Sequence, residues 1–210
     1  MAKLFKPKMP KIGVKGHWSS MKFSENILQD ALIRHVLGLT YLQMADIGEV
    51  FEITEKFKSG TEWIDAWSQM AITLEKRADE SNSNATKESA YLRASTYWRV
   101  SLMYFNSTDD ERLAEYSQNS LDCYHKYLKV SDIDATYVEL PYENTFMPAH
   151  FYKSPATGDN APLMILTPGR DTFAEDTAWI YRQALKRGIQ CLVYDGPGQG
   201  FALRMNGITF

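Results

Sequence analysis

The chain has 210 residues, of which 44% are hydrophobic and 23% are charged, a composition that supports a packed core and argues against disorder. Its formal net charge of −3 gives no electrostatic case for a nucleic-acid partner, because such partners select basic surfaces. The first residues lack the apolar run that a signal peptide or membrane span requires, so we expect no membrane partner and a cytoplasmic location.

Residues 1–22 form the first segment, and we expect a solvated basic tail there, because five lysines and no acidic residue precede the first tryptophan. Residues 23–130 predict a helical region of four or five helices, since apolar side chains recur in steps of three and four residues. Trp67, Tyr97 and Trp98 lie on these stripes. Aromatic side chains at helical spacing favour the helix core over a ligand pocket.

Residues 131–210 have a different pattern that begins with a hairpin. The segments 135–143 and 145–154 predict two antiparallel strands joined by a turn. Pro148 indicates an edge position for the second of these strands, because proline cannot donate to a sheet ladder.

Two further strands and a helix complete the predicted α/β unit. The segments 162–168 and 189–195 are continuous apolar runs, typical of strands that are buried on both faces. The amphipathic segment 173–188 between them predicts a helix, so the unit is a parallel crossover. We expect the last strand to be central in a complete sheet and to expose an open apolar edge here, an aggregation hazard.

The last of these strands runs into the glycine-rich sequence DGPGQG. Its spacing, G-x-G-x-G, fits neither a dinucleotide-binding fingerprint nor a phosphate-binding P-loop, and too little chain follows Gly200 for a well-capped helix. A structural turn that needs positive φ angles is therefore the favoured interpretation.

The preceding strand ends at Pro168 and Gly169. Backbone NH groups from Gly169 to Asp171 lie close to a helix N-terminus, an arrangement that suits a developing negative charge. A plain strand-to-helix connection, with Asp171 or Thr172 as the N-cap, is the alternative that spacing alone favours.

Several motifs together resemble the 2,6-dihydropseudooxynicotine hydrolase group of the α/β-hydrolases. They are PLMILTPGRDTFAED, CLVYDGPGQG, VELPYENTFMPAHFYKS, EWIDAWSQMAITLEKRADE and YLRASTYWRVSLMYF, and the resemblance runs from about residue 40 to 205. It implies an α/β fold: an N-terminal all-helical cap domain in residues 23–130, followed by the first strands and helix of an incomplete hydrolase sheet in residues 131–210.

The resemblance also implies roles for the two loops. The backbone NH of Arg170 is the expected oxyanion-hole donor, with Gly169 keeping the approach open, although relatives usually carry an uncharged residue where Arg170 stands. The second loop is expected to be a rigid element beside the pocket and comprises Asp195, Gly196, Pro197, Gly198, Gln199 and Gly200. The group implies a small-molecule carbonyl substrate, no cofactor, and a possible homodimer of the full-length protein.

The sequence lacks the G-x-S-x-G nucleophile elbow that such hydrolases need before their acid and histidine. None of the four histidines fits the triad position, and no pair has metal-ligand spacing, so we expect no metal. Cys123 and Cys191 are interpreted as buried hydrophobes. We therefore expect an N-terminal part of a longer serine hydrolase, truncated before the elbow and inactive alone. A non-enzymatic helical interaction module with a short α/β appendage is the alternative.

Overall fold

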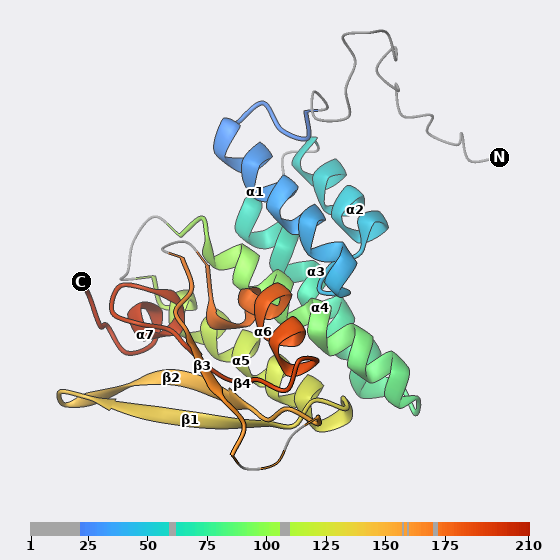
Figure 1. Cartoon of the computed structure of the whole chain (residues 1–210). Coiled ribbons are helices and arrows are strands. Elements are labelled where there is room, and N and C mark those ends of the chain that lie inside the picture. The colour runs from blue at the N-terminus through green and yellow to red at the C-terminus, as the bar shows by residue number, and fades with distance from the viewer. Residues whose placement is uncertain (1–21, 59–61, 106–109, 157, 159, 170–171) are drawn as a thin grey trace, which may run out of the picture.

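The computed structural model describes residues 22–58, 62–105, 110–156, 158, 160–169 and 172–210, so the basic tail lies outside it. A helical layer comes first in the chain and a mixed sheet follows it (Figure 1). The helical layer consists of α1 (Ile27–Gly38), α2 (Ile47–Lys58), α3 (Trp63–Glu80), α4 (Asn84–Leu102) and α5 (Arg112–Val130). The helical N-terminal region predicted from the sequence is confirmed.

Short polar side chains begin several of these helices. The side chain of Asn26 accepts hydrogen bonds from the first turn of α1, and Asp46 accepts from two amides of α2. Ser83 caps α4, which therefore begins within the polar segment that separates it from α3. Trp67, Tyr97 and Trp98 are all buried in the core between helices, as their spacing predicts.

The sheet has four strands in the order β1-β2-β4-β3. The strands are β1 (Ala135–Tyr142), β2 (Thr145–Tyr152), β3 (Leu163–Leu166) and β4 (Gln190–Tyr194). The predicted hairpin is confirmed, because β1 pairs antiparallel with β2. The predicted crossover is confirmed as well, because β3 pairs parallel with β4, while β2 joins β4 antiparallel.

Three predictions about strand positions are wrong. Pro148 does not mark an edge, because β2 lies between β1 and β4; the β2–β4 ladder starts at the next residue, Ala149. The edge of β4 is not open, because β3 covers it. β3 is itself an edge strand among the described residues, with Leu163 50% and Ile165 62% exposed, so it is not buried on both faces.

The segment between β3 and β4 is a 3₁₀ turn, Ala174–Thr177, followed by the two-turn helix α6 (Ala178–Leu185). Gly188 lies just after this helix with a φ of 81°, a left-handed conformation that ends helices, and its amide donates to the carbonyl oxygen of Leu185. A short helix of five residues, α7 (Gly200–Arg204), begins at Gly200, and its N-cap residue Gln199 makes no side-chain capping bond, in keeping with the expectation that no well-capped helix follows the glycines.

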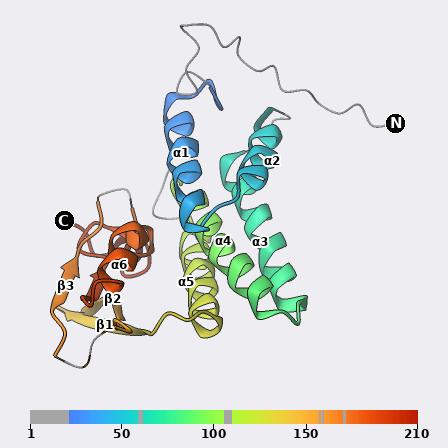
Figure 2. The ribbon, with the colours of Figure 1, turned by 45° about the vertical axis from the view of Figure 1, so that its right-hand side comes forward.

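The helical layer and α6 pack against the same face of the sheet (Figure 2). Three tyrosines join the layers: Tyr124 of α5 shares its hydroxyl with Tyr152 of β2 at 2.8 Å and with Tyr181 of α6 at 2.9 Å. The rings of Tyr152 and Tyr181 stack with centroids 4.2 Å apart. Because these hydroxyl groups hydrogen-bond to one another, they can be buried where the helices, the sheet and α6 meet.

Candidate active site

Two loops meet at the carboxyl ends of the parallel strands. We call residues 167–172 the β3 loop and residues 195–200 the β4 loop. Gln199 connects them, because its side-chain amide donates to the carbonyl oxygen of Pro168 at 2.8 Å and accepts from the amide of Gly196 at 3.2 Å. The two bends that the sequence singled out therefore lie side by side, at the edge where α/β sheets place their ligands.

The β3 loop carries the expected oxyanion donor. Gly169 is exposed, and the Thr172 hydroxyl donates to the Gly169 carbonyl oxygen at 3.0 Å. Thr172 is not the N-cap of the following turn, since that place is taken by Phe173. Arg170 and Asp171 lie outside the described residues, so the role expected for the Arg170 amide stays a prediction.

The side chain of Asp195 connects the segments that follow the two loops. Its side chain is fully buried; Oδ1 accepts from the amide of Ala174 and Oδ2 from the amide of Phe201, each at 2.8 Å. Burial raises the pKa of this carboxyl to about 7, while the two amide bonds act in the opposite direction. The Asp195 carboxylate thus caps two elements: it accepts one amide from the turn after the β3 loop and one from the helix after the β4 loop.

The glycines of the β4 loop permit this close approach. Gly198 and Gly200 have φ angles of 73° and 40°, so the predicted positive-φ turn is confirmed at these two positions. A Cβ atom on Gly200 would overlap the carboxyl group of Asp195, and one on Gly198 would overlap the ring of Phe210. Pro197 and Gly198 form a turn that the amide of Gln199 closes on the carbonyl oxygen of Gly196 at 3.0 Å.

A buried ion pair lies behind the β3 loop. Arg99 of α4 donates from Nε and Nη2 to Oδ1 of Asp176 at 3.2 and 3.1 Å, and both side chains are almost completely buried. The other carboxylate oxygen, Oδ2, accepts from the amide of Phe173 at 3.1 Å. The helical layer therefore contacts the first turn after the β3 loop through one guanidinium group.

A second polar chain runs beside this ion pair. His125 of α5 and His150 of β2 approach with their Nε2 atoms 3.2 Å apart, and His150 Nδ1 lies 3.5 Å from Oε1 of Glu175. Burial, followed by the neighbouring His125 and Arg99, lowers the pKa of His150 to about 3. Burial raises the pKa of Glu175 to about 8, against the opposing effect of Arg99.

Sequence reasoning missed this cluster. His125 and His150 lie on a helix and a strand that are 25 residues apart, and nothing local shows that α5 covers this face of β2. The alternation of His150 with the buried Tyr152 along β2 was the only available signal. No group of three histidine, cysteine or carboxylate residues suits a metal within the described ranges.

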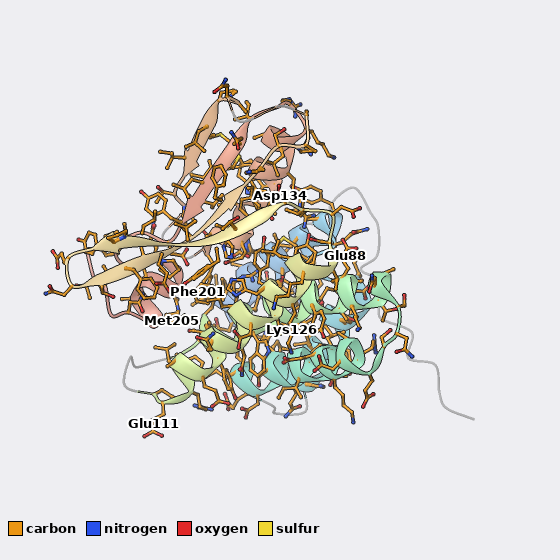
Figure 3. The ribbon with its side chains drawn as sticks, turned by 90° about the horizontal axis from the view of Figure 1, so that it is seen from below. Glu88, Glu111, Lys126, Asp134, Phe201 and Met205 are labelled. Carbon is orange, nitrogen blue, oxygen red and sulfur yellow. The ribbon has the colours of Figure 1, made fainter. Side chains whose placement is uncertain are left out.

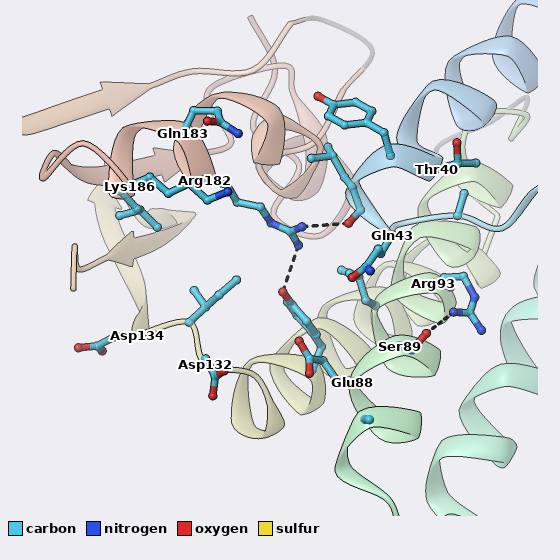
Figure 4. Close-up of a pocket in the computed structure, with 18 of the residues that line it drawn as sticks. Thr40, Gln43, Glu88, Ser89, Arg93, Asp132, Asp134, Arg182, Gln183 and Lys186 are labelled. Atoms are coloured by element: carbon cyan, nitrogen blue, oxygen red, sulfur yellow. Dashed lines mark hydrogen bonds between the residues drawn. The ribbon is translucent and has the colours of Figure 1, made fainter. Parts of the chain in front are cut away.

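A cavity of about 910 Å³ lies at the opposite end of the sheet. Figure 3 shows this separation: Phe201 and Met205 lie towards one end of the hairpin, and Asp134 and Glu88 towards the other. Arg182 projects into the cavity and donates to the carbonyl oxygen of Leu42 and to the Tyr127 hydroxyl (Figure 4). Because no described residue of either loop lines it, this cavity is not the candidate active site.

Comparison with known proteins gives consistent matches. A family model described as "Esterase FrsA-like" matches residues 47–207. The α/β hydrolase xenA of Xenoacremonium sinensis is 28% identical over 199 residues, which cover 89% of this chain and 46% of that protein. The hydrolase phmG of Phaeosphaeria nodorum is 34% identical over 166 residues, 70% of this chain and 38% of that protein. The chain spans less than half the length of these two curated relatives.

A solved structure agrees with these matches. The crystal structure of the 2,6-dihydroxy-pseudo-oxynicotine hydrolase aligns with a TM-score of 0.63 and 21% identity, covering 80% of this chain and 47% of that one. This likeness supports the fold, a helical N-terminal region followed by part of an α/β-hydrolase sheet. None of the described helices is long and apolar enough to cross a bilayer. Because the family model covers most of the chain, this chain belongs to the FrsA-like esterase family of the α/β-hydrolases.

Proposed function

We propose that this chain supplies the helical roof, the first strands and half of the oxyanion hole of a serine-dependent hydrolase that attacks carbonyl compounds. The contact that carries the proposal is the one made by Gln199, which holds Pro168 and Gly196 together at the carboxyl ends of β3 and β4. Membership of a hydrolase family supports the reaction class.

The proposed chemistry uses the β3 loop as an electrostatic element. An activated serine adds to the substrate carbonyl carbon, and the carbonyl oxygen becomes an oxyanion as the tetrahedral intermediate forms. The backbone NH of Arg170 donates to that oxygen, and Gly169 leaves the approach free of a side chain. Substrates of this kind are esters, amides or ketones cleaved at a carbon–carbon bond.

The helical layer would form the roof of this pocket. Phe201 at the start of α7 packs in one buried cluster with Leu102 of α4 and with Leu113 and Leu121 of α5. The β4 loop thus lies directly under helices from the first half of the chain. A roof in this position would exclude water and determine which substrates reach the β3 loop.

The proposal places the nucleophile, acid and catalytic histidine downstream of Phe210, so residues 1–210 alone should have no turnover. The test treats the product of the complete coding sequence and residues 1–210 with a fluorophosphonate probe, and assays both with p-nitrophenyl esters. We expect one labelled serine in a G-x-S-x-G sequence of the longer protein, and neither label nor turnover in the shorter one.

Two results would contradict the proposal. Ester turnover that copurifies with residues 1–210 would show that the machinery lies within this chain. A longer protein that carries no reactive serine, or a coding sequence that stops after Phe210, would favour the non-enzymatic interaction module instead.

A further inference from the structure

The guanidinium group of Arg99 makes hydrogen bonds within its own helix, α4, in addition to its ion pair with Asp176. Its Nη1 donates to the hydroxyl of Ser95 at 2.6 Å, and its Nη2 donates to the hydroxyl of Thr96 at 3.2 Å. Ser95 is fixed in turn by Ser120 of α5, whose hydroxyl donates to the Ser95 carbonyl oxygen at 2.9 Å. The guanidinium group is therefore placed by two helices of the helical layer.

The far side of Arg99 contacts the segment that ends the β3 loop. Asp176 divides its carboxylate between two partners, with Oδ1 accepting from Arg99 and Oδ2 accepting from the amide of Phe173. The next amide, that of Ala174, donates to Asp195. Consecutive amides after the loop thus bind two buried carboxylates, and among the residues that the structure describes it is Asp176, not Asp195, that forms an ion pair with the helical layer.

The other end of the β3 loop has a different anchor. Gln199 binds the carbonyl oxygen of Pro168, and this anchor belongs to the β4 loop rather than to the helices. Pro168 is consequently anchored by Gln199, and the turn that follows the β3 loop is anchored both by Asp195 and, through Asp176, by Arg99. A planar, always-charged guanidinium fork fixes a carboxylate in direction as well as distance.

We propose that Arg99 is a positioning residue through which the helical layer fixes the first turn after the β3 loop, residues 173–176. This inference rests on the proposed function for its catalytic meaning. The structural part, that Arg99 holds the Phe173 amide in place through Asp176, is measurable without any activity.

The variants are chosen to avoid leaving a buried, unpaired charge that would unfold the chain. Arg99→Lys keeps the charge and loses the fork. The double variant Arg99→Met with Asp176→Asn removes both charges together, so neither is left buried and unpaired. The matched control is Arg93→Lys, because Arg93 lies on the same helix and its Nε contacts Glu49 at 2.8 Å entirely within the helical layer.

Amide hydrogen exchange followed by NMR on residues 1–210 provides the first readout. We expect the amide of Phe173 to exchange about tenfold faster in both Arg99 variants, while the amide of Ala174, which donates to Asp195, and the core amides of α3 keep their rates. Arg93→Lys should leave Phe173 unchanged. Equal acceleration across the whole chain, or no change at Phe173, would overturn the inference.

Kinetics of the longer protein provide the second readout, after turnover of the unchanged protein is established. Absence of that turnover would refute the proposed function, whereas the exchange experiment would still decide the structural part. With turnover present, we expect Arg99→Lys to lower kcat about tenfold with KM unchanged, and the double variant to lower it further. A kcat equal to that of the unchanged protein in both variants would refute the positioning role alone.

Discussion

The carboxyl group of Asp195 occupies the space that a side chain on Gly200 would need. This relationship explains why the β4 loop places a glycine there, and it links the spacing of the DGPGQG motif to the two amides that Asp195 binds. The buried carboxylate can accept from both the 3₁₀ turn and α7 because the backbone at Gly200 approaches it without a Cβ atom.

Gly200→Ala should therefore destabilise the chain more than a positive φ alone requires. We expect about 1–2 kcal/mol from the left-handed backbone and about 1–3 kcal/mol more from the overlap with Asp195. Gly207→Ala is the matched control, because Gly207 has a φ of 65° but no atom within 4 Å of the added Cβ. Urea unfolding of residues 1–210 measures both, and equal losses would show that the overlap relaxes freely.

The proposed oxyanion donor can be tested by removing one NH group. Arg170→Pro deletes the backbone donor, and Arg170→Ala deletes the side chain while it keeps the donor. In the longer protein we expect Arg170→Pro to lower kcat by a factor of about 100 to 1,000, the usual effect of losing one oxyanion contact. Arg170→Ala should retain most of the activity. A loss of equal size in both variants would assign the effect to the side chain.

The buried carboxyl groups give stability a definite dependence on pH. The folded pKa is about 7 for Asp195 and about 8 for Glu175, above the ordinary values of 3.8 and 4.5. Both groups therefore bind protons more tightly when folded, so their contribution is fully present at low pH and is lost as pH rises through 7 to 8. His150, with its pKa lowered from 6.5 to about 3, lowers stability only as pH falls below 6.5.

Between pH 6.5 and 8.5 the carboxyl effect should dominate among these three groups, and the free energy of unfolding should fall as pH rises. Glu175→Gln should flatten this slope, because an amide cannot lose the proton. One proton corresponds to at most about 1.4 kcal/mol per pH unit. Glu139→Gln, at an exposed side chain of β1, is the control. A Glu175→Gln slope as steep as that of the unchanged chain would contradict the assignment.

Self-association is expected at β3, whose outward side chains are exposed and apolar. Ile165→Lys should reduce concentration-dependent oligomers of residues 1–210, because a charge on an edge strand disfavours pairing with another chain. Ile47→Lys adds the same charge at a 53% exposed isoleucine of α2 and should have little effect. Analytical ultracentrifugation distinguishes them, and a monomeric unchanged chain at high concentration would contradict the prediction.

The sequence predicted the element order well because its signals are local. The helical stripes, the hairpin and the crossover each follow from a periodicity within one segment, and all three are present. The central position expected for β4 is present, but the sequence did not show that β2 and β3 flank it here, because strand neighbours depend on contacts between distant segments. Pro148 and the apolar run of β3 were therefore misinterpreted, since neither pattern indicates which strand lies beside it.

The candidate site was only half accessible from the sequence. The proximity of the two loops followed from parallel pairing, and Gln199 confirms that they meet. The polar groups behind them could not be found, because Arg99, His150 and Glu175 come from three separate elements. A buried polar cluster of this kind leaves no periodic signal in any one segment.

Tyr124, Tyr152 and Tyr181 share hydrogen bonds where the helical layer meets the sheet, so tyrosine absorbance can report whether the two layers are packed together. Burial holds the pKa of Tyr124 and of Tyr152 far above the ordinary value, so neither phenol ionises while the layers stay packed. Tyrosinate absorbance from these rings would appear only when helices and sheet separate. In an alkaline spectrophotometric titration of the chain, we therefore expect exposed tyrosines to ionise first. A cooperative rise in tyrosinate absorbance should follow at higher pH, when the helical layer separates from the sheet.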